Sequence, residues 1–217
     1  MHPLLWTAFA WMPAAFPADP AGTPAASPSE AVPVQRTGVA PLVGLQVGGH
    51  FSLTPLEAFV LPRLELGIEL PWAQRRFRVA LLSAWTRPAA SGEDTDDRVP
   101  EGTWSWDLTQ TEGLFALGAT VRIPEISDRF VPEITVGPQL YLLRTRVEGE
   151  ASGAPFGESV EQYTRVGFLS SLGVATVLGP GELGLQLVFS LSELDGRVTG
   201  DSSTIALAPL LGYRFVL

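Results

Sequence analysis

The chain has 217 residues, a net charge of −9 and no cysteine, and 46% of its residues are hydrophobic. This length predicts one folded domain with at most a short appendage, and the negative charge argues against nucleic-acid binding, which usually requires a basic surface. The absence of cysteine excludes thiol catalysis, cysteine-ligated zinc and disulfide bonds. All fourteen basic residues are arginine, which excludes a Schiff-base lysine and a P-loop lysine.

The first 37 residues differ in composition from the rest. Residues 4–16 form a short apolar stretch followed by small residues, a pattern typical of a secretory signal peptide and too short for a membrane-spanning helix. We therefore predict a signal peptide at residues 1–18, with a disordered apolar tail as the alternative. Residues 19–37 are rich in proline, alanine and serine and are predicted to form a disordered linker. The folded domain is expected to span residues 38–217.

Apolar and polar residues alternate with a period of two from Gly38 onward, as in a strand whose neighbouring side chains point to opposite faces. Eight such segments are expected, at residues 39–53, 58–70, 77–86, 104–123, 130–142, 165–177, 182–191 and 204–217. In each segment one face is apolar and the other is rich in small, polar or charged residues. This predicts an all-β fold, an eight-stranded antiparallel up-and-down transmembrane barrel with its apolar face toward lipid. The alternative is a water-soluble barrel or sandwich whose apolar faces point inward.

The connections between these segments alternate in length. Short turns follow the second, fourth and sixth segments, and long loops are predicted at residues 87–103, 149–159 and 193–203. Short periplasmic turns and longer extracellular loops are typical of outer-membrane barrels. Within residues 104–123 the apolar residues change from even to odd positions, which predicts a β-bulge near Glu112 and Gly113.

The last predicted strand runs to the end of the chain and carries the segment LGYRF at residues 211–215. This segment is similar to the C-terminal signal of the small, eight-stranded bacterial outer-membrane β-barrel proteins, although here Leu217 follows the last aromatic residue, Phe215. The resemblance covers residues 38–217. It implies export through the periplasm to the bacterial outer membrane and recognition of the C-terminal strand by the barrel-assembly machinery. It also implies contact with outer-membrane lipid and lipopolysaccharide, and it leaves the oligomeric state open.

Two sets of residues have expected roles in such a barrel. Aromatic residues expected at the two membrane interfaces are Trp72, Trp85, Trp104, Trp106, Tyr213 and Phe215. A polar network is expected inside the barrel from Arg63, Glu65, Glu69, Arg76, Arg78, Arg122, Glu133, Arg165, Glu182 and Arg214. Because an eight-stranded barrel is just wide enough for side chains to fill it, this network is interpreted as a salt-bridged plug, with a narrow charge-lined pore as the alternative.

No catalytic, cofactor or metal site is predicted. His50 and Ser52 share the inward face of the first strand and superficially resemble the deacylase-type outer-membrane enzymes that trim lipid A, but a hydrogen-bonded interior histidine is the default. The sequence thus favours a non-enzymatic outer-membrane barrel that is structural or acts through its extracellular loops. A transport pore is the second hypothesis and a lipid-modifying enzyme the third.

Overall fold

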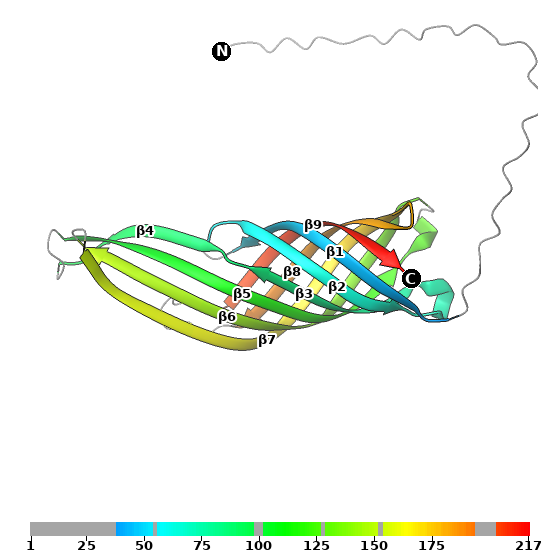
Figure 1. Ribbon diagram of the computed structural model, residues 1–217, viewed down its shortest axis with the longest axis horizontal. Coiled ribbons are helices and arrows are strands. Elements are labelled where there is room, and N and C mark those ends of the chain that lie inside the picture. Colours follow the sequence, from blue (N-terminus) through cyan, green and yellow to red (C-terminus); the bar gives the residue numbers. More distant parts are fainter. Residues whose placement is uncertain (1–37, 54–55, 98–101, 127–128, 152–153, 194–202) are drawn as a thin grey trace, which may run out of the picture. The chain divides into compact units, whose positions relative to one another are not determined.

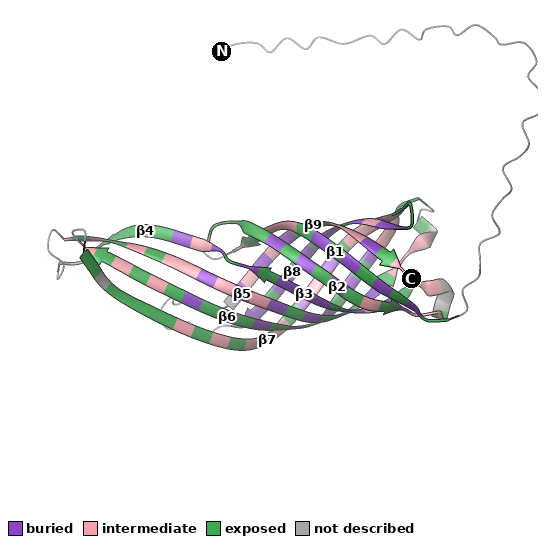
Figure 2. Cartoon of the chain, viewed as in Figure 1, coloured by how far each residue is buried: buried purple, intermediate pink, exposed green. Residues whose placement is uncertain are grey.

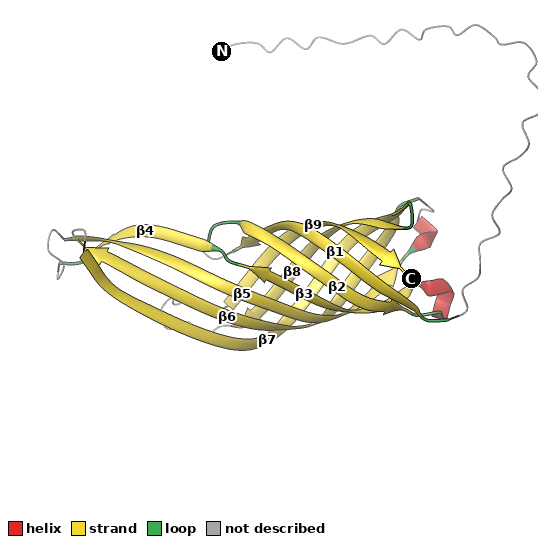
Figure 3. Ribbon diagram, in the orientation of Figure 1, coloured by secondary structure: helices red, strands yellow, loops and turns green. Residues whose placement is uncertain are grey.

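The computed structural model describes residues 38–53, 56–97, 102–126, 129–151, 154–193 and 203–217. The predicted signal peptide and linker, and most of the loop predicted at 193–203, lie outside these ranges. The strands are β1 (Ala40–Ser52), β2 (Phe59–Glu69), β3 (Phe77–Thr86), β4 (Ala89–Thr95), β5 (Thr103–Arg122), β6 (Val131–Ala151), β7 (Ala154–Leu178), β8 (Gly181–Glu193) and β9 (Ser203–Val216) (Figure 1). Two short 3-10 turns, η1 (Trp72–Arg75) and η2 (Pro124–Ile126), complete the elements (Figure 3). Among the described residues, no helix has the length and apolar character needed to cross a membrane.

The strands close into a barrel. Each pairs antiparallel with its neighbours, and β1 completes the ring by pairing with both β2 and β9. Strands β3 and β4 both pair with β5, β3 along residues 112–121 and β4 along residues 103–109. They are therefore successive segments of one wall position. The wall has eight strands, which confirms the predicted eight-stranded antiparallel up-and-down barrel.

The strands are tilted relative to the barrel axis. Stepping between paired residues from Pro41 on β1 leads around the wall and back to Phe51, ten residues further along the same strand. The intermediate partners are Ile68, Val79, Ala119, Val136, Ser170, Phe189 and Leu207. Strand number and this stagger together fix the diameter, and at eight strands the interior is narrow enough for side chains to fill it.

Burial alternates strictly along most strands (Figure 2). The outward positions are apolar and exposed, as at Leu45, Leu117 and Val166, which are 65%, 56% and 73% exposed. The inward positions hold the charged and amide side chains, which are buried. A water-soluble barrel would show the reverse arrangement, because large contiguous apolar surfaces on soluble proteins are rare. The apolar faces therefore point outward, and the soluble alternative is wrong.

The predicted bulge in β5 is absent. Pairing of β5 with β3 and with β6 runs without a register shift through Glu112 and Gly113. Trp104, Trp106 and Leu108 instead lie on the same face as the interior residues. The outward face of β5 is apolar on the C-terminal side of Gly113 and polar in the upper part of the strand, on the N-terminal side of Gly113. The outward residues of this upper part are Thr103, Ser105, Asp107, Thr109 and Thr111. The change in apolar parity thus marks the point at which a straight strand leaves its apolar surroundings.

Two of the predicted long loops contain strand. Within residues 87–103 the structure forms β4, and within 149–159 it extends β6 to Ala151 and begins β7 at Ala154. With β5, these segments project beyond the rest of the barrel as a four-stranded sheet (Figure 1). Turn-forming and acidic residues suggested loops there, but backbone pairing across β4, β5, β6 and β7 holds the segments extended in spite of their polarity.

Gly137 allows the close approach of β6 to β5. A Cβ atom at this position would lie 1.9 Å from the carbonyl oxygen of Leu117, so even alanine requires the two strands to move apart. Gly137→Ala is expected to lower the free energy of unfolding by about 1–3 kcal/mol. Gly157→Ala is the control, because no atom lies within 4 Å of the added Cβ there. Urea unfolding in detergent micelles, followed by tryptophan fluorescence, measures both; equal stability of the two variants would contradict this account.

Candidate functional site

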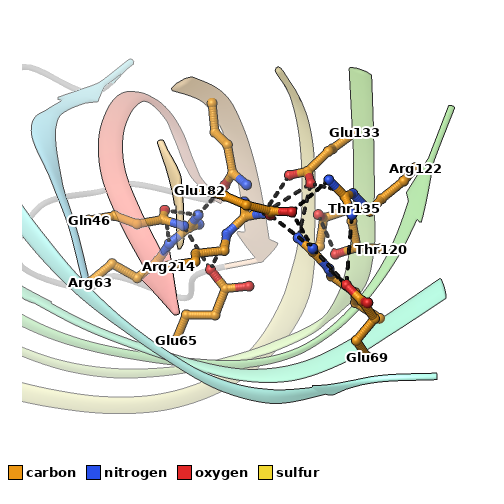
Figure 4. Close-up of polar contacts among 12 residues, drawn as sticks. Gln46, Arg63, Glu65, Glu69, Thr120, Arg122, Glu133, Thr135, Glu182 and Arg214 are labelled. Carbon is orange, nitrogen blue, oxygen red and sulfur yellow. Dashed lines mark hydrogen bonds and ion pairs between the residues drawn. The ribbon is translucent and has the colours of Figure 1, made fainter. Parts of the chain in front are cut away.

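Polar side chains fill the end of the barrel at which the short turns lie (Figure 4). Eight of the ten predicted interior residues meet there: Arg63, Glu65, Glu69, Arg78, Arg122, Glu133, Glu182 and Arg214. Each occupies an inward position of its strand, and Gln46 on β1 and Gln186 on β8 join them. Every strand except β4 and β7 contributes a side chain, so residues far apart in sequence form one network.

Glu133 and Glu182 form the centre of this network, because three arginines contact both carboxylates. Arg78 lies 3.1 Å from Glu133 and 2.8 Å from Glu182. Arg122 lies 3.1 Å and 2.9 Å from the same two groups. Arg214 lies 2.8 Å from Glu133 and 3.8 Å from Glu182. The two carboxylates thus link β6 and β8 to β3, β5 and β9 across the lumen.

The remaining members attach β1 and β2 to this centre. Arg78 donates two hydrogen bonds to the same oxygen of Glu69, at 2.9 and 2.8 Å. Glu65 accepts from Arg214 at 3.0 Å and from the Gln46 amide at 2.9 Å. Among the described residues, no carboxylate lies this close to Arg63, which donates instead to the amide oxygen of Gln46.

The buried members of the network balance in charge. They are four guanidinium groups and four carboxylates, all largely removed from solvent, and the partly buried Arg75 adds a contact to Glu69 at 3.2 Å from the margin. A buried ion without a partner would cost several kcal/mol, whereas paired and hydrogen-bonded ions recover much of that cost. Nearby, Thr120 and Thr135 are cross-strand partners whose hydroxyls lie 2.8 Å apart. The arrangement therefore stabilises a packed interior.

An apolar layer lies next along the lumen. It contains Leu61, Leu82, Leu114, Leu169, Val188 and Leu210 together with several alanines. All of these leucines and the valine, except Leu210, border a cavity of about 20 Å³, to which His50, Arg63, Gln139 and Ser190 add polar groups. Such a space holds roughly one water molecule. The interior is consequently filled by ion pairs at one level and by apolar side chains at the next.

A second polar cluster, which the sequence interpretation did not identify, lies toward the projecting sheet. Glu112 accepts a hydrogen bond of 2.7 Å from Gln110, and its other carboxylate oxygen lies 3.4 Å from His50 Nε2. Thr145 donates to Gln110 at 3.1 Å. The predicted bulge would have changed the faces of Gln110 and Glu112. The polar residues at odd positions 103–111 were the signal that the strand continues straight.

His50 is 3% exposed and faces the lumen. Its neighbours are therefore Glu112 and the interior cavity, and the lipid-facing surface lies on the other side of the wall. In the described part of the chain, no group of three or more histidine, aspartate and glutamate side chains is arranged to hold a metal ion.

The other predicted residues lie at the margins of the interior. Arg76 is partly buried at the short-turn end. Arg165 stands beside Tyr163 near the opposite end, its guanidinium 5.7 Å from the ring centroid, and is separate from the ion-pair network.

The predicted interfacial aromatics divide into two groups. Trp72, Trp85 and Phe215 are exposed on the outside, and Tyr213 packs edge-on against Phe215 with ring centroids 5.0 Å apart. Trp104 and Trp106 are half-buried on the inward face of the projecting part of β5.

Comparison with known proteins finds similar structures but no similar sequences. No protein-family model matches the chain. No curated protein sequence matches it either. Neisserial surface protein A is 16% identical, with a TM-score of 0.43, and the match covers 83% of this chain and 97% of that one. The attachment invasion locus protein Ail of Yersinia pestis is 12% identical (TM-score 0.45), covering 82% and 99%. The outer membrane protein OprG of Pseudomonas aeruginosa is also 12% identical (TM-score 0.44), covering 82% and 96%. At these identities the likeness concerns the fold alone.

Replacement of Glu133 tests the network. Glu133→Gln removes one of the two carboxylates shared by three arginines and leaves a net positive charge in the lumen, so we expect a loss of about 3–5 kcal/mol in the free energy of unfolding. Glu150→Gln, an exposed carboxylate of β6, is the matched control and should change stability by less than about 0.5 kcal/mol.

The double variant Glu133→Gln/Arg122→Gln restores the charge balance. It should recover part of the lost stability in the same urea titration. A double variant less stable than Glu133→Gln alone would show that the individual hydrogen bonds, and not charge balance, dominate.

Proposed function

We propose that this chain is a non-enzymatic barrel protein of the bacterial outer membrane, closed to ion flow, that acts through the sheet projecting from its extracellular end. The observation that carries the proposal is the combination of an apolar exterior around the wall with an interior filled at successive levels. The exterior matches hydrocarbon, and closure of the sheet satisfies the backbone hydrogen bonds that a membrane-spanning strand must make.

The orientation follows from the two ends of the barrel. The end with the short connections also holds both ends of the barrel segment, where the Leu217 amide donates to the carbonyl of Pro41 at 2.9 Å. Short turns and the chain termini lie on the periplasmic side of small bacterial barrels of this type. The opposite end, with the sheet of β4, β5, β6 and β7, is then extracellular.

The filled interior argues for a structural or binding role over transport. A conducting pore requires a continuous hydrated path, but here the ion-pair network is followed by the apolar layer around Leu61, Leu82 and Leu114. Each of the three central arginines already has carboxylate partners. Conduction would require those contacts to open.

The projecting sheet offers the surface that a binding role needs. Trp104, Trp106 and Leu108 share one face of β5, and Val147 is the cross-strand neighbour of Leu108. A Cβ added at Gly92 on β4 would come within 2.6 Å of the Trp106 indole, so this ring lies over the glycine. Aromatic residues, tryptophan among them, are enriched at protein contact surfaces.

Single-cysteine labelling tests the placement in the membrane, because the natural chain has no cysteine. On intact Gram-negative cells, a membrane-impermeant maleimide should label Ser105→Cys, which lies on the projecting sheet. It should label Ile126→Cys only after permeabilisation, since that residue lies at the short-turn end. Leu117→Cys, in mid-wall, should remain unlabelled under both conditions. Rapid labelling of Leu117→Cys would mean that the wall faces water.

Ion conductance tests whether the interior is closed. The full chain refolded into a planar lipid bilayer should insert without producing discrete current steps, because the lumen is filled by the ion-pair network and the apolar layer. Insertion is verified independently by the heat-dependent gel mobility of the protein recovered from liposomes. Stable current steps from the inserted wild type would favour the pore hypothesis instead.

A further inference from the structure

A group of arginines lies on the outside of the barrel, where its apolar surface ends. Arg87, Arg144 and Arg146 border a hollow of about 170 Å³, together with the hydroxyl-bearing Thr109 and Thr111. We call these five residues the rim arginine site. Arg87 lies in the connection between β3 and β4, the two threonines lie on β5, and Arg144 and Arg146 lie on β6.

The position of the rim arginine site follows from the register. Trp85, Gly113 and Leu142 form one row across β3, β5 and β6, because Gly113 pairs with both of the other residues. Two residues further toward the projecting sheet, the outward residues are Arg87, Thr111 and Arg144, and Thr111 pairs with Arg144. Trp85 is 54% exposed and Leu142 is 42% exposed. The change from lipid-type to cationic surface thus takes place within one row of side chains.

The arginines differ in how far the protein itself satisfies them. Arg146 has two carboxylate partners, Glu158 at 2.9 Å and Glu148 at 2.5 Å. Arg87 and Arg144 are exposed, and within the described ranges neither makes an ion pair or a side-chain hydrogen bond. The carboxylates therefore fix Arg146, while two guanidinium groups beside it are left available to an anion.

We infer that the rim arginine site binds a phosphate group on the headgroup of a lipid in the outer leaflet. This inference rests on the proposed placement of the barrel in the outer membrane. Guanidinium groups bind phosphate oxygens with paired, charge-assisted hydrogen bonds, and the threonine hydroxyls can donate further ones. A lipid whose acyl chains lie along Trp85, Phe115 and Leu142 carries its headgroup to this height. A phosphate in solution lacks that anchorage, so the geometry favours the lipid-borne group.

Native mass spectrometry of the full-length, detergent-solubilised protein provides the test, with diphosphoryl lipid A as the probe and the dephosphorylated lipid as its comparison. The wild type should retain the phosphorylated lipid at least tenfold more strongly than the dephosphorylated one. Arg87→Gln/Arg144→Gln should abolish that preference, because it removes the two available guanidinium groups. The loss of a tenfold preference corresponds to about 1.4 kcal/mol of binding free energy. Arg87→Lys/Arg144→Lys, which keeps the charge but loses the paired geometry, should be intermediate.

Arg129→Gln serves as the matched control, because it removes an exposed arginine at the opposite end of the barrel. It should leave lipid binding within twofold of the wild type. Equal retention of the two lipids by the wild type, or unchanged retention by the double glutamine variant, would overturn the inference. Displacement of the lipid by millimolar inorganic phosphate would also overturn it, by showing a site for free phosphate.

Insertion of the same proteins into phosphatidylcholine liposomes separates this inference from the proposed function. A wild type that fails to insert contradicts the membrane placement itself. A wild type that inserts but shows no phosphate preference contradicts only the rim arginine site. The double glutamine variant should insert normally, because its substitutions lie above the apolar surface and outside the interior network.

Discussion

Charges placed inside a narrow barrel must neutralise one another there, and most of this structure follows from that requirement. Arg78, Arg122 and Arg214 belong to different strands, yet each contacts both Glu133 and Glu182. These contacts exist only when the wall has closed with each strand in its correct register. A slip of one residue would turn a charged side chain toward lipid, where it has no partner. The interior network therefore specifies the register as well as filling the lumen.

The exterior obeys a complementary constraint. Outward residues are apolar over the height of the wall and become polar in the row that contains Thr111 and Arg144. The inward face of β5 changes in the opposite sense, from polar at Glu112 and Gln110 to apolar at Leu108 and Trp106. One continuous strand thus changes in character on both of its faces within a few residues. The row of Trp85, Gly113 and Leu142 marks the boundary, and the features that we associate with interaction lie beyond it.

Much of the fold could be predicted from the sequence, because a period of two is a local property. The alternation of Val43 and Leu45 with Gly44 and Gln46 predicts both strand and facing without knowledge of any partner. The projecting sheet could not be predicted in this way, since Ala89–Thr95 has the composition of a loop and is strand only because β5 pairs with it.

The predicted bulge failed for a related reason. It assumed that the apolar face of β5 always points outward, whereas Trp104 and Trp106 lie on the same face as the interior residues of that strand. Within the interior, the inward facing of Glu133 and Arg214 was predictable. The shared role of the Glu133 and Glu182 carboxylates depends on distances across the lumen that no local pattern contains.

The interior ion pairs also bear on how long the folded molecule lasts. Opening the seam between β1 and β9 would separate Arg214 on one side from Glu65 on the other while hydrocarbon surrounded both. Charges exposed in that way raise the energy of the opened barrel far more than that of the closed one, and they therefore raise the barrier to unfolding. Slow opening of this seam would prolong the lifetime of the folded barrel.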